Sequence, residues 1–238
     1  MGMEPPATPL PRRTFLSSAL ALGAAGPAGF VAACSSDTQP EKTESAIVSP
    51  SAQSTTGPAG SSGSGAKVLM VYFSRAGEQY WDGGRRTVSV GNTAMIAGFI
   101  SNAAHGDVYR IEAADAYPSA YEPTVARNVS EMQADARPEI ADPLPVIDGY
   151  DTILLGSPVR AVQAPMIMRT LVEGVAGLAG KTVHPFVTYA VSQMGNVMDD
   201  YTRLYSEATF GEGLAIRGEE ARQAESQVRE WLSRIGVR

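Results

Sequence analysis

The sequence is poor in the residues that build disulfide frameworks and metal centres. Its 238 residues include one cysteine, Cys34, and two histidines, and only 7% of them are aromatic. A single cysteine cannot form a disulfide within the chain. Neither His105 nor His184 has a second ligand at the spacing of a metal site, so we expect no metal. A strongly apolar run is also missing, because the stretch 17–33 is rich in alanine and glycine and contains Pro27, which makes it a poor membrane span.

An excess of positive charge is absent as well. The chain has 19 lysines and arginines against 25 aspartates and glutamates, a formal net charge of −6. We therefore expect no nucleic-acid partner. An acidic surface would suit basic redox partners, although it also serves solubility alone. Serine hydrolase chemistry is disfavoured too, because Ser157 lacks the Gly-x-Ser-x-Gly turn and a plausible histidine partner.

The N-terminal segment has the pattern of an export signal. Arg12 and Arg13 precede the weakly apolar stretch, which ends in Val-Ala-Ala before Cys34 and resembles the lipobox of bacterial lipoproteins. We expect residues 1–33 to be a twin-arginine signal peptide and Cys34 to carry the lipid. This lipid would be the only membrane contact, at the outer face of the bacterial cytoplasmic membrane. The alternative is a free thiol in an unprocessed tail.

Residues 34–66 and 67–238 differ sharply in composition. The first range is dominated by Ser, Thr, Gly, Pro and Ala and predicts a flexible linker. The second predicts one domain of alternating strands and helices. Strands are expected at 67–73, 107–112, 151–156, 181–188 and 208–216, and helices at 92–104, 121–136, 165–175, 195–206 and 219–235. This alternation indicates right-handed βαβ units and a parallel sheet covered by helices on both faces.

Ligands of such sheets lie beyond the carboxyl ends of the strands, so the loops there are the places to search. The first loop begins Phe73-Ser74-Arg75-Ala76 and resumes, after the insertion 77–90, at Gly91-Asn92-Thr93. A glycine at a helix start allows close backbone approach, and free amides with the helix dipole favour an anion. Taken alone, Asn92 or Thr93 could equally be a helix cap.

Three loops together resemble those of the flavodoxin family. Without its insertion the first loop reads Tyr-Phe-Ser-Arg-Ala-Gly-Asn-Thr, similar to the family's phosphate loop. Residues 156–166 and 188–195 resemble its two ring-binding loops, and 213–218 resembles its last strand. The resemblance implies a three-layer sandwich around a five-stranded parallel sheet of order 2-1-3-4-5.

The resemblance also implies FMN as the cofactor, held by all three loops. The residues implied are Ser74, Arg75, Ala76, Gly91, Asn92 and Thr93 from the first loop, Ser157, Pro158, Val159, Arg160 and Ala161 from the second, and Thr188, Tyr189, Ser192 and Gly195 from the third. Tyr189 would stack on the flavin or flank its edge.

Arg160 and Ala161 depart from the family pattern, which commonly has an aromatic residue there. Loss of one stacking wall would weaken binding by about 1 to 3 kcal/mol. We hypothesise that the Arg160 guanidinium lies flat on the ring instead and favours the reduced, anionic flavin. An Arg160→Ala variant with unchanged FMN affinity and flavin potential would refute this hypothesis.

The insertion 77–90 contains Tyr80, Trp81, the pair Gly83-Gly84 and the pair Arg85-Arg86. It is either a flap beside the cofactor or a surface loop that its aromatic residues hold in place.

The sequence thus predicts an FMN-binding electron carrier or oxidoreductase, in which the cofactor supplies the chemistry. The expected partner is a redox protein or a small quinone-like acceptor. One alternative is an NAD(P)H-dependent quinone or metal-ion reductase, and another is a cell-surface binding module that has lost FMN.

Overall fold

The computed structural model describes residues 67–238. The predicted signal peptide, the linker and Cys34 lie outside the described residues. Within 67–238, none of the helices combines the length and the apolar character that crossing a bilayer requires.

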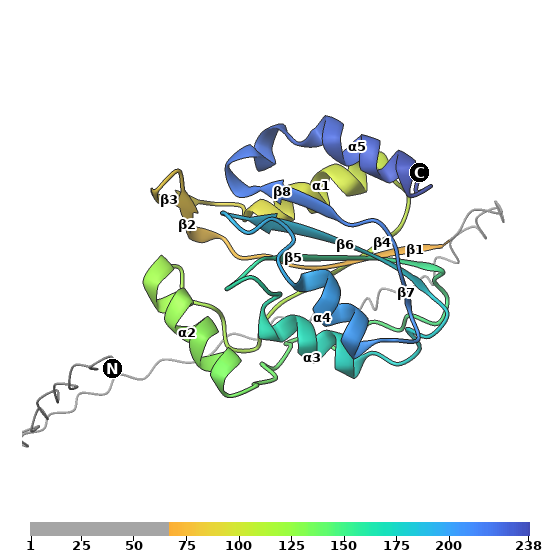
Figure 1. The fold of residues 1–238 in the computed structure, drawn as a ribbon, viewed down its shortest axis with the longest axis horizontal. Helices are drawn as coiled ribbons and strands as arrows, with labels where there is room; N and C mark the ends of the chain where they lie inside the picture. The colour runs from red at the N-terminus through yellow and green to blue at the C-terminus, as the bar shows by residue number, and fades with distance from the viewer. Residues whose placement is uncertain (1–66) are drawn as a thin grey trace, which may run out of the picture. The chain divides into compact units, whose positions relative to one another are not determined.

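A parallel sheet forms the centre of the domain (Figure 1). Its strands are β1 (Val68–Phe73), β4 (Asp107–Ile111), β5 (Thr152–Pro158), β6 (Thr182–Tyr189), β7 (Thr209–Phe210) and β8 (Leu214–Arg217). They are ordered β4-β1-β5-β6-β7, with β8 also paired to β6, and every pairing is parallel. When β7 and β8 are counted as one broken strand, this is the predicted order 2-1-3-4-5, which is confirmed.

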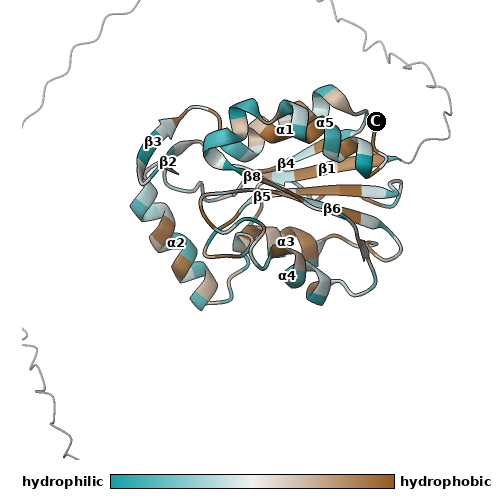
Figure 2. Ribbon diagram, turned by 45° about the horizontal axis from the view of Figure 1, so that its top comes forward, coloured by the Kyte–Doolittle hydropathy of each residue, from teal (hydrophilic) through white to brown (hydrophobic). Residues whose placement is uncertain are grey.

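Helices cover both faces of the sheet. One face carries α1 (Asn92–Ala103) and α5 (Glu225–Arg234), and the other carries α3 (Met166–Gly174) and α4 (Val197–Leu204). Figure 2 shows apolar residues along the central strands and polar residues on the outward sides of α1 and α5. The predicted three-layer sandwich is therefore correct.

The two halves of the core follow from the alternation of side chains along β1. Leu69, Val71 and Phe73 pack toward α3 and α4, whereas Val68 and Met70 pack toward α1 and α5. Strands buried on both faces read as continuous apolar runs, which is why β1 and β5 could be located from the sequence.

The last strand and the last helix are each interrupted, contrary to the prediction of a strand over 208–216 and a helix over 219–235. Between β7 and β8 the chain bends around the ring of His184, whose Nδ1 lies 2.9 Å from the Glu212 carbonyl oxygen. A Cβ at Gly211 would lie 2.2 Å from that ring. A 3₁₀ helix, Gly218–Gln223, then precedes α5.

The insertion 77–90 is a β-hairpin, which the residue pattern did not predict. It consists of β2 (Gly77–Trp81) and β3 (Gly84–Val88), joined through Asp82 and Gly83 with φ of 45° and 83°. Two positive φ values are what a two-residue hairpin turn requires. The hairpin lies beyond the main sheet, next to the start of α2 (Figure 1).

Helix α2 (Tyr121–Gln133) stands apart from the layers that the other helices form. It lies at the end of the sheet near the hairpin, and its packing partners are β2 and α3 (Figure 1). It is three residues shorter than the expected helix over 121–136, because Asp135 adopts a left-handed φ of 44°. This placement leaves one side of α2 facing the carboxyl ends of the strands.

Candidate functional site

A cavity of about 350 Å³ lies at the carboxyl ends of β5 and β6. It is bounded by the second and third predicted loops, the hairpin, α2 and the first residue of α1. The residues that line it are Gln79, Tyr80, Asn92, Tyr121, Val125, Asn128, Val129, Met132, Pro158, Val159, Arg160, Ala161, Val162, Thr188, Tyr189, Ala190, Val191, Ser192 and Gly218. Eight residues predicted for the cofactor line this one cavity: Asn92, Pro158, Val159, Arg160, Ala161, Thr188, Tyr189 and Ser192. The cavity lies at the edge of the sheet where the strand ends predicted a ligand.

The two halves of the first loop meet at Gly91, although fourteen residues separate them in the sequence. A Cβ at Gly91 would lie 2.4 Å from both the Arg75 carbonyl oxygen and Ser74 Oγ. Only glycine allows this approach. The hairpin therefore projects from a loop whose two halves are in contact. The segment of Ser74, Arg75 and Ala76 and the residue Gly91 lie together in the fold, as the prediction had joined them.

The start of α1 is fixed by side chains of the same loop and of β6. Ser74 Oγ accepts a hydrogen bond from the amide of Ala94 at 3.0 Å, and the hydroxyls of Thr93 and Thr188 lie 2.8 Å apart. The amides of Asn92 and Thr93 have no backbone acceptor within the described residues, as expected at a helix N-terminus. This arrangement leaves two backbone donors at the start of α1, and of the two residues Asn92 lines the cavity. Ser74, Thr93 and Ser157 themselves are buried and do not line it.

Arg75 has a structural role that the sequence did not predict. Its Nη1 donates to the carbonyl oxygens of Pro118 and Ser119 at 3.0 and 2.9 Å, and its Nη2 donates to that of Glu78. Burial lowers the pKa of this guanidinium. The side chain thus ties the hairpin to the segment before α2 and does not line the cavity.

The second loop contains a strained turn. Ala161 and Val162 have φ of 44° and 63°, and the backbones of Arg160 and Gln163 are hydrogen-bonded to each other in both directions. A β-branched residue with positive φ is a true outlier, and such strain gathers at functional sites. The Val162 carbonyl oxygen accepts the Asn196 amide at 2.6 Å, and a Cβ at Gly195 would lie 2.2 Å from it. Gly195 therefore joins the two ring-side loops rather than lining the cavity.

Tyr189 lies at the end of β6, opposite Arg217 of β8. The next residue along, Gly218, approaches the α1 start so closely that a Cβ there would lie 2.5 Å from Asn92 Nδ2. The end of β8 thus holds Asn92 and Tyr189 beside each other at the cavity.

Helix α2 supplies a wall of the cavity that sequence reasoning missed. Tyr121, Val125, Asn128, Val129 and Met132 follow the i, i+4, i+7, i+8, i+11 spacing of one helical face. The same spacing would be expected of a helix packed on a sheet, so the pattern by itself could not identify the cavity.

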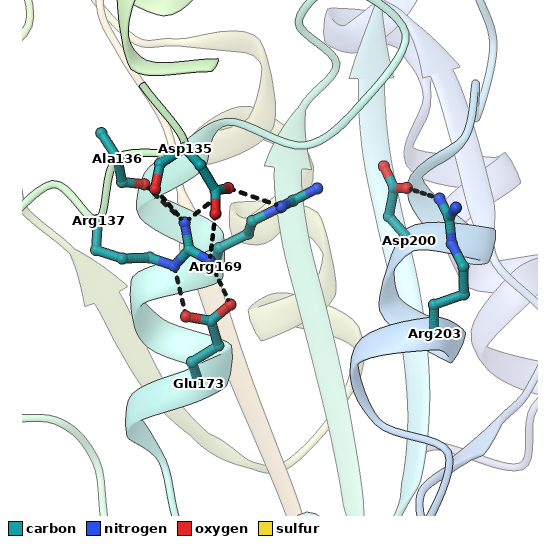
Figure 3. A network of polar contacts seen from close by, with 7 residues as sticks. All are labelled: Asp135, Ala136, Arg137, Arg169, Glu173, Asp200 and Arg203. Atoms are coloured by element: carbon teal, nitrogen blue, oxygen red, sulfur yellow. Dashed lines mark hydrogen bonds and ion pairs between the residues drawn. The ribbon is translucent and has the colours of Figure 1, made fainter. Parts of the chain in front are cut away.

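An ion-pair network fixes the far end of α2 (Figure 3). Arg137, just after α2, bonds Glu173 of α3 at 2.8 Å, and Asp135 pairs with both Arg137 and Arg169 at 3.0 and 3.2 Å. A network positions groups better than a single exposed pair does. Its effect is to hold α2 against α3.

The near end of α2 is attached to the hairpin. The Arg85 guanidinium lies 3.6 Å from the ring centroid of Tyr121 and bonds Glu122 at 2.9 Å. Tyr80 lines the cavity, whereas Trp81 is covered by Arg86, 4.5 Å from its ring centroid. The hairpin thus contributes Tyr80 to the cavity wall, whereas Trp81 packs within the hairpin itself.

Arg160 contributes a positive charge to the lining of the cavity. Within residues 67–238 no carboxylate oxygen lies within 4.0 Å of it. Burial, with the neighbouring charge of Arg75, lowers the pKa of Arg160 to about 10, and Tyr121 and Tyr117 act in the opposite direction. The guanidinium is thus charged at neutral pH and close to the start of α2.

The cavity also displays apolar surface. Val129, Val162 and Val191 are 41%, 48% and 78% exposed, and all three line it. Within 67–238, His, Cys, Asp and Glu form no cluster suited to a metal ion. A planar ligand with an apolar body and a polar end near Asn92 fits such walls.

Comparisons with known proteins agree with this description. The sequence model of the family described as "Flavodoxin" matches residues 86–235. No curated protein matches the chain. A solved structure of a proposed flavoprotein from Bacteroides eggerthii DSM 20697 is 31% identical, with a TM-score of 0.58, and the match covers 73% of this chain and 100% of that one.

Two further solved structures are similar. A second proposed flavoprotein, from Bacteroides uniformis ATCC 8492, is 28% identical, with a TM-score of 0.58, over 71% of this chain and 99% of that one. A flavoprotein in complex with FMN from Lactobacillus acidophilus NCFM is 17% identical, with a TM-score of 0.48, over 68% and 99%. The similarity to this last structure is too low to support a statement about the ligands of this chain.

Proposed function

The chain belongs to the flavodoxin family, and from this premise we propose that it binds FMN in the cavity and acts as an electron carrier or oxidoreductase. The observation that carries the proposal is one cavity with apolar walls that is lined by the second and third predicted loops and, at one end, by Asn92, whose amide at the start of α1 has no backbone acceptor.

The residues present suit FMN. Asn92 and the amides at the start of α1 would hold the phosphate, because amides and the helix dipole favour an anion there. The loops 158–162 and 188–192 would hold the ring, with Tyr189 and the exposed valines against its apolar surface. FMN would supply the redox chemistry, and the protein would orient it and exclude water.

Purification of the full chain tests this proposal. We expect a yellow protein with a flavin absorption spectrum, or a colourless one that regains it when FMN is added. Since the phosphate would gain charge-assisted hydrogen bonds of about 1.5 to 3 kcal/mol each, FMN should bind at least tenfold more tightly than riboflavin. A chain that binds neither flavin would favour the binding module that has lost FMN.

A reductase for a small molecule is a second candidate, and the extension of the cavity to α2 favours it. A carrier that served only a protein partner would need no pocket beyond the ring. Rapid oxidation of NADH or NADPH by the FMN-loaded protein, in the presence of a quinone or a metal-ion acceptor, would support this candidate. If no such oxidation occurs, the electron carrier is the function that the result supports.

We further propose that the protein works at the outer face of the bacterial cytoplasmic membrane. Twin-arginine export carries folded proteins, so the flavin would be loaded before export, and Cys34 would hold the lipid. A Cys34→Ser variant should move from the membrane fraction to the soluble fraction, with FMN still bound. A wild-type protein that is already soluble in fractionated cells would contradict the anchor.

A further inference from the structure

The cavity extends beyond the three family loops to helix α2. The loops 158–162 and 188–192 and the α1 start form one part of it, and α2 forms the opposite wall. On that wall Val125, Val129 and Met132 present apolar side chains, and Val129 remains 41% exposed. Apolar side chains on a helix face are normally covered, so this wall has the character of a contact surface for a ligand.

Two polar side chains that line the cavity have no hydrogen-bond or ion-pair partner within the described residues. Asn128 is only 7% exposed, yet its amide makes no hydrogen bond to the rest of 67–238. Arg160, across the cavity, has no carboxylate within 4.0 Å in the same range. The polar atoms of Asn128 and Arg160 are not fully enclosed, and both residues line the cavity, so their donors are accessible from it. Both side chains therefore point to a ligand that would supply acceptors.

The nearby carboxylates are engaged elsewhere. Glu131 accepts from Arg127 at 2.7 Å and from the Tyr117 hydroxyl at 2.9 Å, and Glu122 pairs with Arg85 at 2.9 Å. Arg75, on the other side, adds a second positive charge whose bonds go to backbone carbonyls. The cavity is thus positive near Arg160 in a protein whose net charge is −6.

We propose that the space between α2 and the turn at Arg160 is a second ligand site, which takes a small organic anion with a planar, apolar body. Arg160 and Asn128 would bind its anionic oxygen, and Val125, Val129 and Met132 would pack on its body. The inference rests on the proposed function, because it leaves the loop 188–192 and the backbone of 158–162 to FMN, assigns the Arg160 side chain to the anion, and makes the anion the small molecule that meets the flavin.

Two quinones with similar bodies test the site. 2-Hydroxy-1,4-naphthoquinone is an anion at neutral pH, whereas 2-methyl-1,4-naphthoquinone is neutral. Both would be titrated calorimetrically into the FMN-loaded full chain at low ionic strength. We expect the anion to bind at least tenfold more tightly, and Arg160→Gln to remove this preference while Arg160→Lys restores part of it. Val129→Glu should weaken both probes.

Arg222→Gln is the matched control, because Arg222 is an exposed arginine that does not line the cavity. It should bind both probes as the wild type does. Equal affinity of the two probes for the wild type, or a preference that survives Arg160→Gln, would overturn the inference. Loss of FMN in Arg160→Gln, with the preference intact in the apo chain, would also overturn it, because the guanidinium would then belong to the flavin.

The apo chain separates this inference from the proposed function. If the full chain binds no flavin but still prefers the anionic quinone through Arg160, the anion site stands and the flavin function fails. If FMN binds and no anion preference is found, the flavin function stands and the second site fails.

Discussion

Gly91→Ala is expected to lower the affinity for FMN about a hundredfold. The new Cβ would lie 2.4 Å from the Arg75 carbonyl oxygen and from Ser74 Oγ, and backbone must move to relieve such contacts. The start of α1 would then shift away from the loop that closes beside it. Two charge-assisted hydrogen bonds to the phosphate, each contributing about 1.5 kcal/mol or more, would be lost or stretched. Titration of the apo chain with FMN, followed by flavin fluorescence, measures the change.

Gly98→Ala provides the control within the same helix. Gly98 is exposed in the middle of α1, and an added Cβ there meets nothing within 4 Å. This variant should bind FMN normally and should be more stable by about 0.5 to 1 kcal/mol, because alanine is the better helix former. If Gly91→Ala kept its FMN affinity but lost that for riboflavin, the phosphate would lie elsewhere.

The sequence predicted the parts of the site that depend on chain order. A buried strand followed by a polar loop must place that loop at the carboxyl edge of a parallel sheet, so Asn92, Pro158 and Thr188 could be assigned to one edge from the residue pattern alone. Gly91 was placed there as well, because the loop without 77–90 resembles the phosphate loop of the flavodoxin family. The position of the loops thus needed only local pattern and strand order, whereas the joining of the two halves needed the resemblance.

What the sequence could not provide was the position of α2 and the bonds of the arginines. The apolar face of α2 has the same spacing whether it packs on a sheet or lines a cavity, and only the tertiary contacts of Arg137 and Arg85 decide between them. Arg75 was predicted to contact the cofactor, yet two of its hydrogen bonds go to the carbonyl groups of Pro118 and Ser119, more than forty residues away in the chain. Partners so distant leave no local signal.

The sequence did not predict the hairpin or the break in the last strand, for a related reason. Arg85 and Arg86 on β3 are exposed, so the alternation of apolar residues that predicts a strand is weak there. The break after Phe210 depends on His184, a residue of another strand, and on close backbone contact at Gly211.

Trp231→Ala is expected to reduce the free energy of unfolding by about 3 to 5 kcal/mol, the range for truncating a fully buried tryptophan. Trp231 is fully buried, with ring centroids 6.3 Å from Phe186 and 6.4 Å from His184. Its Nε1 donates to the Glu212 carbonyl oxygen at 3.1 Å. Urea denaturation followed by circular dichroism measures the loss. Trp231→Phe keeps most of the ring and should cost less than half as much.

The consequence should extend to the cofactor, although Trp231 does not line the cavity. The carbonyl that Trp231 binds stands just before β8, which pairs with the last residues of β6 and leads to Gly218 beside Asn92. The space that Trp231→Ala leaves behind β8 would let this strand move, and Asn92 and Tyr189 would then be held less firmly. We therefore expect Trp231→Ala to weaken FMN binding more than Trp231→Phe does, at temperatures where both remain folded. Equal FMN affinity in the two variants would show that β8 holds its position without the Trp231 side chain.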